Sequence, residues 1–161
     1  MELKGKKVFI LGERDGVPAL AIEECLKDVG VEIIYKDTQC FVWTAAGAMD
    51  QVVQQELKKA AEKYGNENVV IILGSPDEDS ADIFAETVTI GDPTYAGPLA
   101  GVSLGLSVYH ILEPEIKQQI TEHVYEEQIG LMEISLEKEK ICNIMKVARG
   151  KNLSAWGCHL Q

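Results

Sequence analysis

Cys40 and the ten residues after it form the segment of this chain best suited to chemistry. The segment reads Cys40-Phe41-Val42-Trp43-Thr44-Ala45-Ala46-Gly47-Ala48-Met49-Asp50. A cysteine between the end of a strand and the start of a helix lies where backbone N–H groups and the helix dipole favour an anion, which raises the reactive thiolate fraction. In Cys-x-x-Cys redox motifs, one sulfur at such a junction attacks and the other resolves. Here the fourth position is Trp43, which has no redox or nucleophilic chemistry, so the motif lacks one partner.

The residues around this segment predict the strand and the helix that would position it. Before it, the apolar run Val31 to Tyr35 indicates a strand that could extend to Cys40. After it, the stretch from Asp50 to Tyr64 carries apolar residues at helical spacing, and Gly65 suits the end of that helix. Cys40 is therefore expected between a strand end and a helix start.

Three further elements complete an alternating pattern in the first half of the chain. The expected elements are a strand at Lys6 to Gly12, a helix from Pro18 to Gly30 and a wholly apolar strand at Val69 to Gly74. Alternating strands and helices are typical of right-handed βαβ units on a parallel sheet. The sequence predicts a three-layer α/β fold with Rossmann-like or flavodoxin-like units and strand order 2-1-3. The loops Gly12–Gly16, Cys40–Gly47 and Gly74–Asp79 would then share the carboxyl edge of the sheet.

The second half of the chain is predicted to be mostly helical. The expected elements are an acidic turn at Pro76 to Asp82, a short helix at Ala81 to Val88, a surface-shaping Gly/Pro loop at Gly91 to Pro98, a helix at Ala100 to Leu112 and a helical part beyond Pro114. Residues 87–90 would also suit a strand. We expect one domain over residues 1–149 and an irregular tail over residues 150–161.

Composition narrows the class of protein. The chain has 161 residues, 46% of them hydrophobic, which suits one soluble domain with a real core. No apolar run is long enough for a membrane span and the N-terminus has no signal-peptide pattern, so we expect a cytoplasmic protein. The four cysteines are far apart, which indicates reduced thiols. The net charge of −11 argues against nucleic-acid or anionic-membrane binding and favours partners with basic patches.

Several other residues have types that could do chemistry but patterns that favour structural roles. The pattern Gly12-x-x-x-Gly16 lacks a nucleotide-binding spacing and carries two acids where an anion would sit, so a structural loop is favoured. The remaining candidates are read as a core histidine (His110), a surface histidine (His123), inert core thiols (Cys25 and Cys142), a solvated helix face (Glu23 and Glu24) and a pair without enough partners for zinc (Cys158 and His159). We expect no metal site and no bound cofactor.

The segment around position 43 resembles selenoprotein A of the glycine reductase complex, which sarcosine and betaine reductases share. In that family the residue at position 43 is selenocysteine, encoded by UGA, and Trp is one base change away from that codon. The same family is resembled at residues 12–16, 21–26, 85–89, 91–101 and 124–130. The resemblance runs from about Lys4 to Lys146 and departs at Trp43 and in the tail.

The resemblance implies a catalytic role for position 43 and for Cys40. It implies that a selenolate at position 43 accepts a carboxymethyl group from protein B and passes the two-carbon unit to protein C. Cys40 would then close a selenide–sulfide bond with position 43, which thioredoxin would reopen. Thr44 would support the site by capping the following helix or by bonding the selenolate. The Trp43 form is expected to be inactive in this reaction.

Two other function classes stay open at the level of sequence. A stand-alone thiol-disulfide oxidoreductase would need a second cysteine beside Cys40 in place of Trp43. A flavodoxin-like nucleotide- or flavin-binding module would need a phosphate-binding loop after the first strand, where the chain instead has Glu13-Arg14-Asp15.

Overall fold

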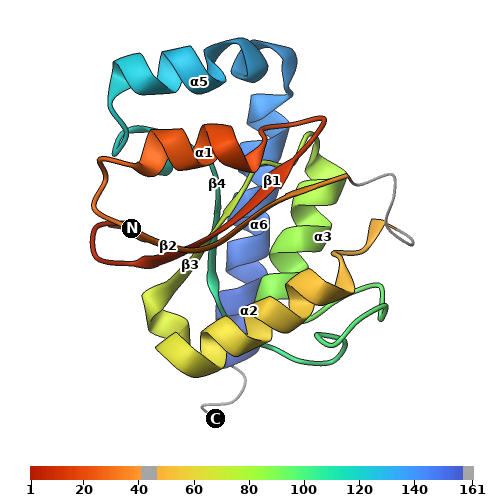
Figure 1. Ribbon diagram of the computed structural model, residues 1–161. Helices are drawn as coiled ribbons and strands as arrows, with labels where there is room; N and C mark the ends of the chain where they lie inside the picture. Colours follow the sequence, from red (N-terminus) through yellow and green to blue (C-terminus); the bar gives the residue numbers. More distant parts are fainter. Residues whose placement is uncertain (41–46, 158–161) are drawn as a thin grey trace.

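A computed structural model of the chain describes residues 1–40 and 47–157, with side chains described as far as Asn152. Four parallel strands form the central sheet (Figure 1). They are β1 (Lys7–Glu13), β2 (Glu32–Gln39), β3 (Val69–Leu73) and β4 (Ser107–His110), in the spatial order β2-β1-β3-β4. The predicted parallel sheet with order 2-1-3 is confirmed, and β4 extends it on the β3 side.

Helices cover both faces of this sheet and give the predicted three layers (Figure 1). On one side lie α1 (Ala19–Leu26) and α5 (Glu122–Ser135), which pack against each other. On the other side lie α2 (Gln51–Tyr64) and α3 (Glu78–Thr89), with α6 (Lys138–Gly157) alongside α3 and β4. Two short helices, η3 (Asn66–Asn68) and α4 (Pro114–Lys117), complete the described elements. Among these helices, none is both long and apolar enough to cross a membrane.

The burial of each strand follows its place in the sheet. All five residues of β3 (Val-Val-Ile-Ile-Leu) are buried, as expected for a central parallel strand that helices cover on both faces. β2 is an edge strand and is mostly half-exposed. The apolar faces of α1 and α2 are buried against this core, as the sequence predicted, including Ala21, Cys25, Val53 and Leu57.

Side-chain caps set the starts of α2 and α3, and a glycine ends α2. The Asp50 carboxylate accepts hydrogen bonds from the backbone N–H groups of Val52 (2.8 Å) and Val53 (3.4 Å), which fixes the start of α2. Gly65 ends this helix with φ +83°, as predicted. The Asp77 side chain accepts from the Ser80 N–H (2.8 Å), so α3 begins at Glu78, three residues earlier than predicted. The cap was missed because the acidic run around it is also typical of a turn.

The predicted helix at Ala100 to Leu112 is wrong. The structure has a loop and then β4, which pairs with β3 from Val70↔Ser107 to Leu73↔His110. Gly101 (φ +70°) and Gly105 (φ +63°) adopt left-handed backbone conformations that an α-helix cannot contain. The chain can therefore turn here and fill the open edge of β3.

The C-terminal part is helical, as predicted. Three helices (α4, α5 and α6) make up this part, and α6 continues to Gly157. The predicted irregular tail from Gly150 is therefore wrong for residues 150–157, and residues 158–161 lie outside the described part of the chain. Lys151 helps to hold this end of α6 against α3, because its ammonium lies 3.7 Å from Asp82 and 4.0 Å from Glu86.

Candidate functional site

Cys40 directly follows the last residue of β2, at the carboxyl edge of the sheet. Glu13 and Gln39 are paired at the ends of the β1–β2 ladder, and the Arg14 N–H donates to the Gln39 carbonyl (2.9 Å). The Glu13–Gly16 turn that follows β1 is therefore fixed beside Cys40, whose side chain is half-buried. Trp43 and Thr44, the other two predicted site residues, lie outside the described residues.

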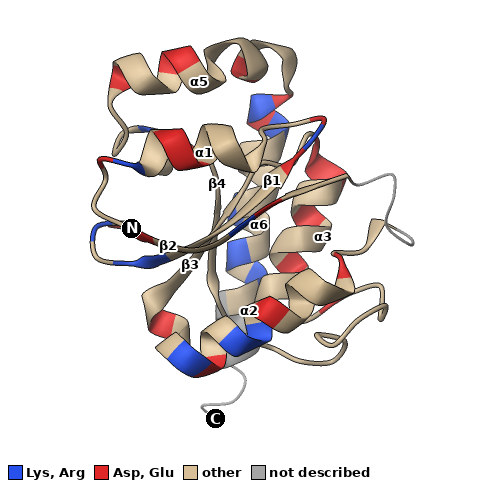
Figure 2. Ribbon diagram, viewed as in Figure 1, with Lys and Arg blue, Asp and Glu red and all other residues tan. Residues whose placement is uncertain are grey.

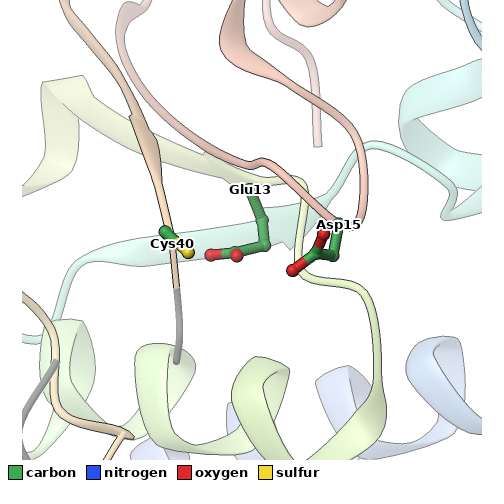
Figure 3. A group of neighbouring side chains, drawn as sticks. All are labelled: Glu13, Asp15 and Cys40. Carbon is green, nitrogen blue, oxygen red and sulfur yellow. The ribbon is translucent and has the colours of Figure 1, made fainter. Parts of the chain in front are cut away.

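Three side chains converge at this edge (Figure 3). The sulfur of Cys40 and a carboxylate oxygen from each of Glu13 and Asp15 all lie within 4.8 Å of one another. Figure 3 shows the Glu13 carboxylate directed at the Cys40 sulfur. Glu13 is only 2% exposed, whereas Asp15 is exposed. Both acids were expected on a charged loop, and the burial of Glu13 beside Cys40 was not predicted. The sequence did contain a signal for this contact, because Glu13 ends β1 and Cys40 directly follows the neighbouring strand β2.

Arg14 supplies the positive charge in this cluster. Its guanidinium Nε lies 3.5 Å from the Asp15 carboxylate. The hydrogen bond and charge of Asp15, followed by the nearby Cys40, raise the pKa of this exposed guanidinium. Cys40 therefore has both negative and positive neighbours.

The same three donor atoms are of types that divalent metals accept, but their number is small. Zinc in proteins is usually bound by four ligands, or by three and a water, drawn from cysteine, histidine and carboxylates. Exposed acidic groups such as Asp15 are common without any metal. We therefore assign these residues to the surroundings of the Cys40 thiol.

Close backbone contacts account for the glycines at this edge. A Cβ on Gly16 would lie 2.2 Å from the Gly74 carbonyl oxygen, and one on Gly12 would lie 2.1 Å from the Ala19 nitrogen. The Gly74 carbonyl also accepts from the Val17 N–H (2.8 Å). These contacts join the loops after β1 and β3, as the predicted shared edge requires. They also support the structural interpretation of the Gly12-x-x-x-Gly16 pattern over a phosphate loop.

A buried network holds the residues that lead into α2. Gln54, with its side chain fully buried on α2, donates to the Met49 carbonyl (2.9 Å) and to Asp92 (3.2 Å), and accepts from the Leu99 N–H (3.0 Å). Met49 itself is buried. Gln54 thereby connects the residues just before α2 to the loop that follows α3.

The Asp92 carboxylate organises that loop. It accepts from the Thr94 N–H (2.8 Å) and hydroxyl (2.7 Å), from the Ala96 N–H (2.9 Å) and from the Gly97 N–H (3.1 Å). Burial opposes ionisation, but the hydrogen bonds from Thr94, Gln54 and Ala96 outweigh it and lower the pKa of Asp92. A surface-shaping loop was predicted here, but the role of this carboxylate was not, because its partner Gln54 lies 38 residues away.

The other candidate residues have structural roles, as predicted. His110 is fully buried, with Nε2 2.8 Å from the Ser75 carbonyl and Nδ1 accepting from the Leu112 N–H (3.1 Å). These partners fix the neutral ring with its proton on Nε2, and burial lowers the pKa of His110 to about 4. Burial raises the pKa of the Cys25 thiol to about 11 and also raises that of Cys142.

The surface candidates agree with their predictions as well. Glu23 and Glu24 form ion pairs with Lys36 and Lys27 on the outer face of α1, and His123 is exposed. Cys158 and His159 lie outside the described residues.

Comparison with known proteins identifies the family. Residues 3–149 match the family described as glycine reductase complex selenoprotein A. Three relatives carry the name glycine/sarcosine/betaine reductase complex component A. The one from Gottschalkia purinilytica is 54% identical over 150 residues, which are 93% of this chain and 100% of the relative.

The other two are similarly close. The relative from Symbiobacterium thermophilum is 53% identical over 156 residues (97% of this chain and 100% of the relative), and that from Carboxydothermus hydrogenoformans is 57% identical over 139 residues (86% and 89%). No solved structure matches the chain. The family match covers nearly the whole chain, including Cys40 and position 43, and the chain therefore belongs to the glycine reductase complex selenoprotein A family.

Proposed function

We propose that this chain is the component of a glycine, sarcosine or betaine reductase that carries a carboxymethyl group on residue 43 when that residue is selenocysteine. The observation that carries the proposal is the family match over residues 3–149. The position of Cys40, at the carboxyl end of β2 beside the Glu13–Gly16 turn, supports it. Functional groups of open α/β sheets gather at this edge.

The first step would be a nucleophilic displacement. Protein B holds the amine substrate through a carbonyl-derived Schiff base, and the selenolate at position 43 attacks the α-carbon. A selenium–carbon bond forms, the carbon–nitrogen bond breaks, and the nitrogen stays with protein B. A selenol is more acidic than a thiol, so it is ionised at neutral pH and is both a good nucleophile and a good leaving group.

The second step would reduce the carbon and oxidise the selenium. The carboxymethyl selenoether, the Cys40 thiol and a thiol of protein C would give an acetyl thioester on protein C, a selenide–sulfide bond between position 43 and Cys40, and water. The α-carbon gains two electrons, which the selenium–sulfur pair supplies. Phosphate then releases acetyl phosphate from protein C, and the dithiol of thioredoxin reduces the selenide–sulfide bond.

The chain's own residues would divide this work. Cys40 would resolve the selenoether, and its sulfur lies within 4.8 Å of a carboxylate oxygen from each of Glu13 and Asp15. Thr44 would cap or bond at the start of the following helix. Trp43 has no selenium or sulfur atom to attack the α-carbon, so the chain with Trp at this position would carry no carboxymethyl group.

An acetyl phosphate assay with proteins B and C, thioredoxin and a reductant tests this function. Four proteins are compared, namely the Trp43 chain, Trp43→Sec, Trp43→Cys, and Cys40→Ser on the selenocysteine background. We expect no product from the Trp43 chain, turnover from the Sec form and at most a trace from the Cys form, because a thiolate is a poorer leaving group. Cys40→Ser should accept one carboxymethyl group without turnover. Equal activity of the Trp43 and Sec forms would refute the mechanism.

A further inference from the structure

β2 is the open edge of the sheet on the side away from β4. Among the described residues it pairs only with β1, from Lys7↔Glu32 to Glu13↔Gln39. All eight of its residues except Gln39 are exposed or half-exposed. The N–H and C=O groups on the outer side of an edge strand can pair with a strand of another molecule. β2 therefore offers a long strand edge for such pairing.

A hollow of about 280 Å³ lies beside this edge, between β2 and α2. The rings of Phe9 and Tyr35, stacked with their centroids 4.3 Å apart, form part of its lining. The other lining residues come from β2 and from the second half of α2, namely Ile34, Glu56, Lys59, Ala60, Lys63 and Tyr64. When a strand is added to a sheet edge, main-chain hydrogen bonds give affinity and neighbouring pockets give specificity. A strand paired with β2 would also meet this side of α2.

The α2 side of the hollow carries charges of both signs. Glu56 and Lys59 form an ion pair about one helical turn apart (2.8 Å), and Lys63 lies one turn further along. Figure 2 shows acidic and basic residues together on this half of α2. In a dimer with a two-fold axis, the two copies of α2 would run antiparallel beside the joined strands, so Glu56 of one copy would face the lysines of the other. This surface is complementary to itself, which favours a second copy of the chain as its partner.

The charges of β2 restrict how two copies of the strand can pair. Antiparallel pairing about Tyr35 places Lys36 of each copy opposite Ile34 of the other. Pairing about Lys36 or about Asp37 would place two lysines or two aspartates directly opposite each other, which is destabilising. Ile34 is the extra residue at the register shift with β1, whereas the ladder is regular from Tyr35 onward. Because Tyr35 also lies in the middle of β2, pairing about it joins the greatest length of strand.

We propose that this chain forms a two-fold symmetric dimer in which the two β2 strands pair antiparallel about Tyr35 and join the two sheets into one. The α2 helices flank the joined strands, with Glu56 of each copy facing Lys59 of the other. Cys40 is five residues from Tyr35, so the two Cys40 residues of the dimer lie about 33 Å apart, at opposite edges of the joined sheet. Each Cys40 therefore stays open to its own partners. The dimer concerns the assembly of the chain with itself and does not depend on the proposed function.

Sedimentation equilibrium of the full chain in the micromolar range tests the dimer, and a mass equal to one chain throughout that range would overturn it. Oxidative cross-linking then tests the register. Residues directly opposite in an antiparallel pair have Cα atoms about 4.5–5.5 Å apart, which a disulfide can span. Tyr35→Cys should therefore give a covalent dimer that the parent does not give. Asp37→Cys is the control on the same strand, because its two copies would lie about 13 Å apart. A dimer in which Tyr35→Cys does not cross-link, or Asp37→Cys cross-links equally, would overturn this pairing.

Charge reversal tests the contribution of α2. Glu56→Lys should weaken dimerisation about tenfold, because two-fold symmetry turns two attractions into repulsions, and adding Lys59→Glu should restore it. Glu137→Lys is the matched control, because Glu137 forms the same kind of ion pair with Lys140 (2.8 Å) at the start of α6, which packs on β4 at the opposite edge of the sheet. It should change the dimer affinity less than about twofold. Circular dichroism checks that each variant is folded. Equal effects of Glu56→Lys and Glu137→Lys would overturn the assignment of α2 to the interface.

Discussion

Replacement of Asp92 by asparagine should destabilise the protein strongly, although it removes only one charge and keeps the shape of the side chain. One Asp92 oxygen accepts from the Thr94 N–H and hydroxyl, and the other accepts from Ala96, Gly97 and Gln54. An amide would place an NH₂ group against donors on one of these sides. With the NH₂ group on the Thr94 side, the Thr94 hydroxyl can turn to accept from it, but the Thr94 N–H loses its acceptor and the remaining bonds are no longer made to a charged group, at a total cost of about 3 kcal/mol. The expected loss in free energy of unfolding is therefore about 3 kcal/mol.

The pH dependence of this loss follows from the direction of the Asp92 pKa shift. Hydrogen bonds outweigh burial and lower the pKa in the folded state. The carboxylate's contribution to stability is therefore fully present above the unfolded-state pKa of about 3.9 and is lost as pH falls through the lower folded-state value. Asparagine does not titrate. The gap in unfolding free energy between parent and Asp92→Asn should thus be widest near neutral pH and should shrink in acid.

Urea unfolding followed by circular dichroism measures both effects. Titrations of the parent and Asp92→Asn at neutral pH give the size of the loss, and a series toward acid gives its pH dependence. Asp28→Asn is the control, because Asp28 is exposed on the surface and its replacement should change stability by less than about 0.5 kcal/mol. A loss of under about 1 kcal/mol for Asp92→Asn, or a loss that does not shrink in acid, would show that the carboxylate does not organise this loop.

Two further predictions concern the carboxyl edge of the sheet and its cysteine. Gly16→Ala should lower the free energy of unfolding, measured in urea, by about 2–3 kcal/mol, because the new methyl would lie 2.2 Å from the Gly74 carbonyl oxygen. Gly150→Ala is the control and should cause no loss of stability, because a Cβ there has nothing within 4 Å. Equal stability of the two variants would contradict the close contact at Gly16. In peptide mapping of N-ethylmaleimide-treated folded protein, Cys40 should react about tenfold or more faster than Cys25, which is buried and has a pKa raised to about 11. Equal rates in the folded protein would mean that Cys25 is accessible, and the difference should disappear in urea.

The first half of the fold was predictable because local pattern and tertiary environment agree there. The wholly apolar β3 could only be a covered strand, and the apolar spacing of α2 ends at a glycine that the backbone needs. The parallel sheet followed from the alternation of strands and helices. These rules also located Cys40 at a strand end.

The parts that were missed depend on contacts that the local sequence does not encode. β4 has only four residues, and its place is decided by the open edge of β3. The role of Gln54 was hidden because a single polar residue on an amphipathic helix gives no sign of a partner 38 residues away. Glu13 looked like a surface acid because its burial comes from neighbouring segments. In each case a distant segment supplies the partner.

The chain at Cys40 and the chain from Gly47 to α2 are held by different kinds of interaction, and this separates stability from chemistry. On the Cys40 side, main-chain pairing of β1 with β2 holds the chain, and this pairing does not involve the Cys40 sulfur. On the Gly47 side, the side chains of Gln54 and Asp92 do so. Changes to Gln54 or Asp92 should therefore alter stability and activity together. A change of the Cys40 sulfur should leave stability nearly unaltered, because a half-buried side chain at the end of a strand contributes little packing. If Cys40→Ser on the selenocysteine background blocks turnover while unfolding at the same urea concentration as its parent, the lost function belongs to the chemistry of the sulfur and not to the fold.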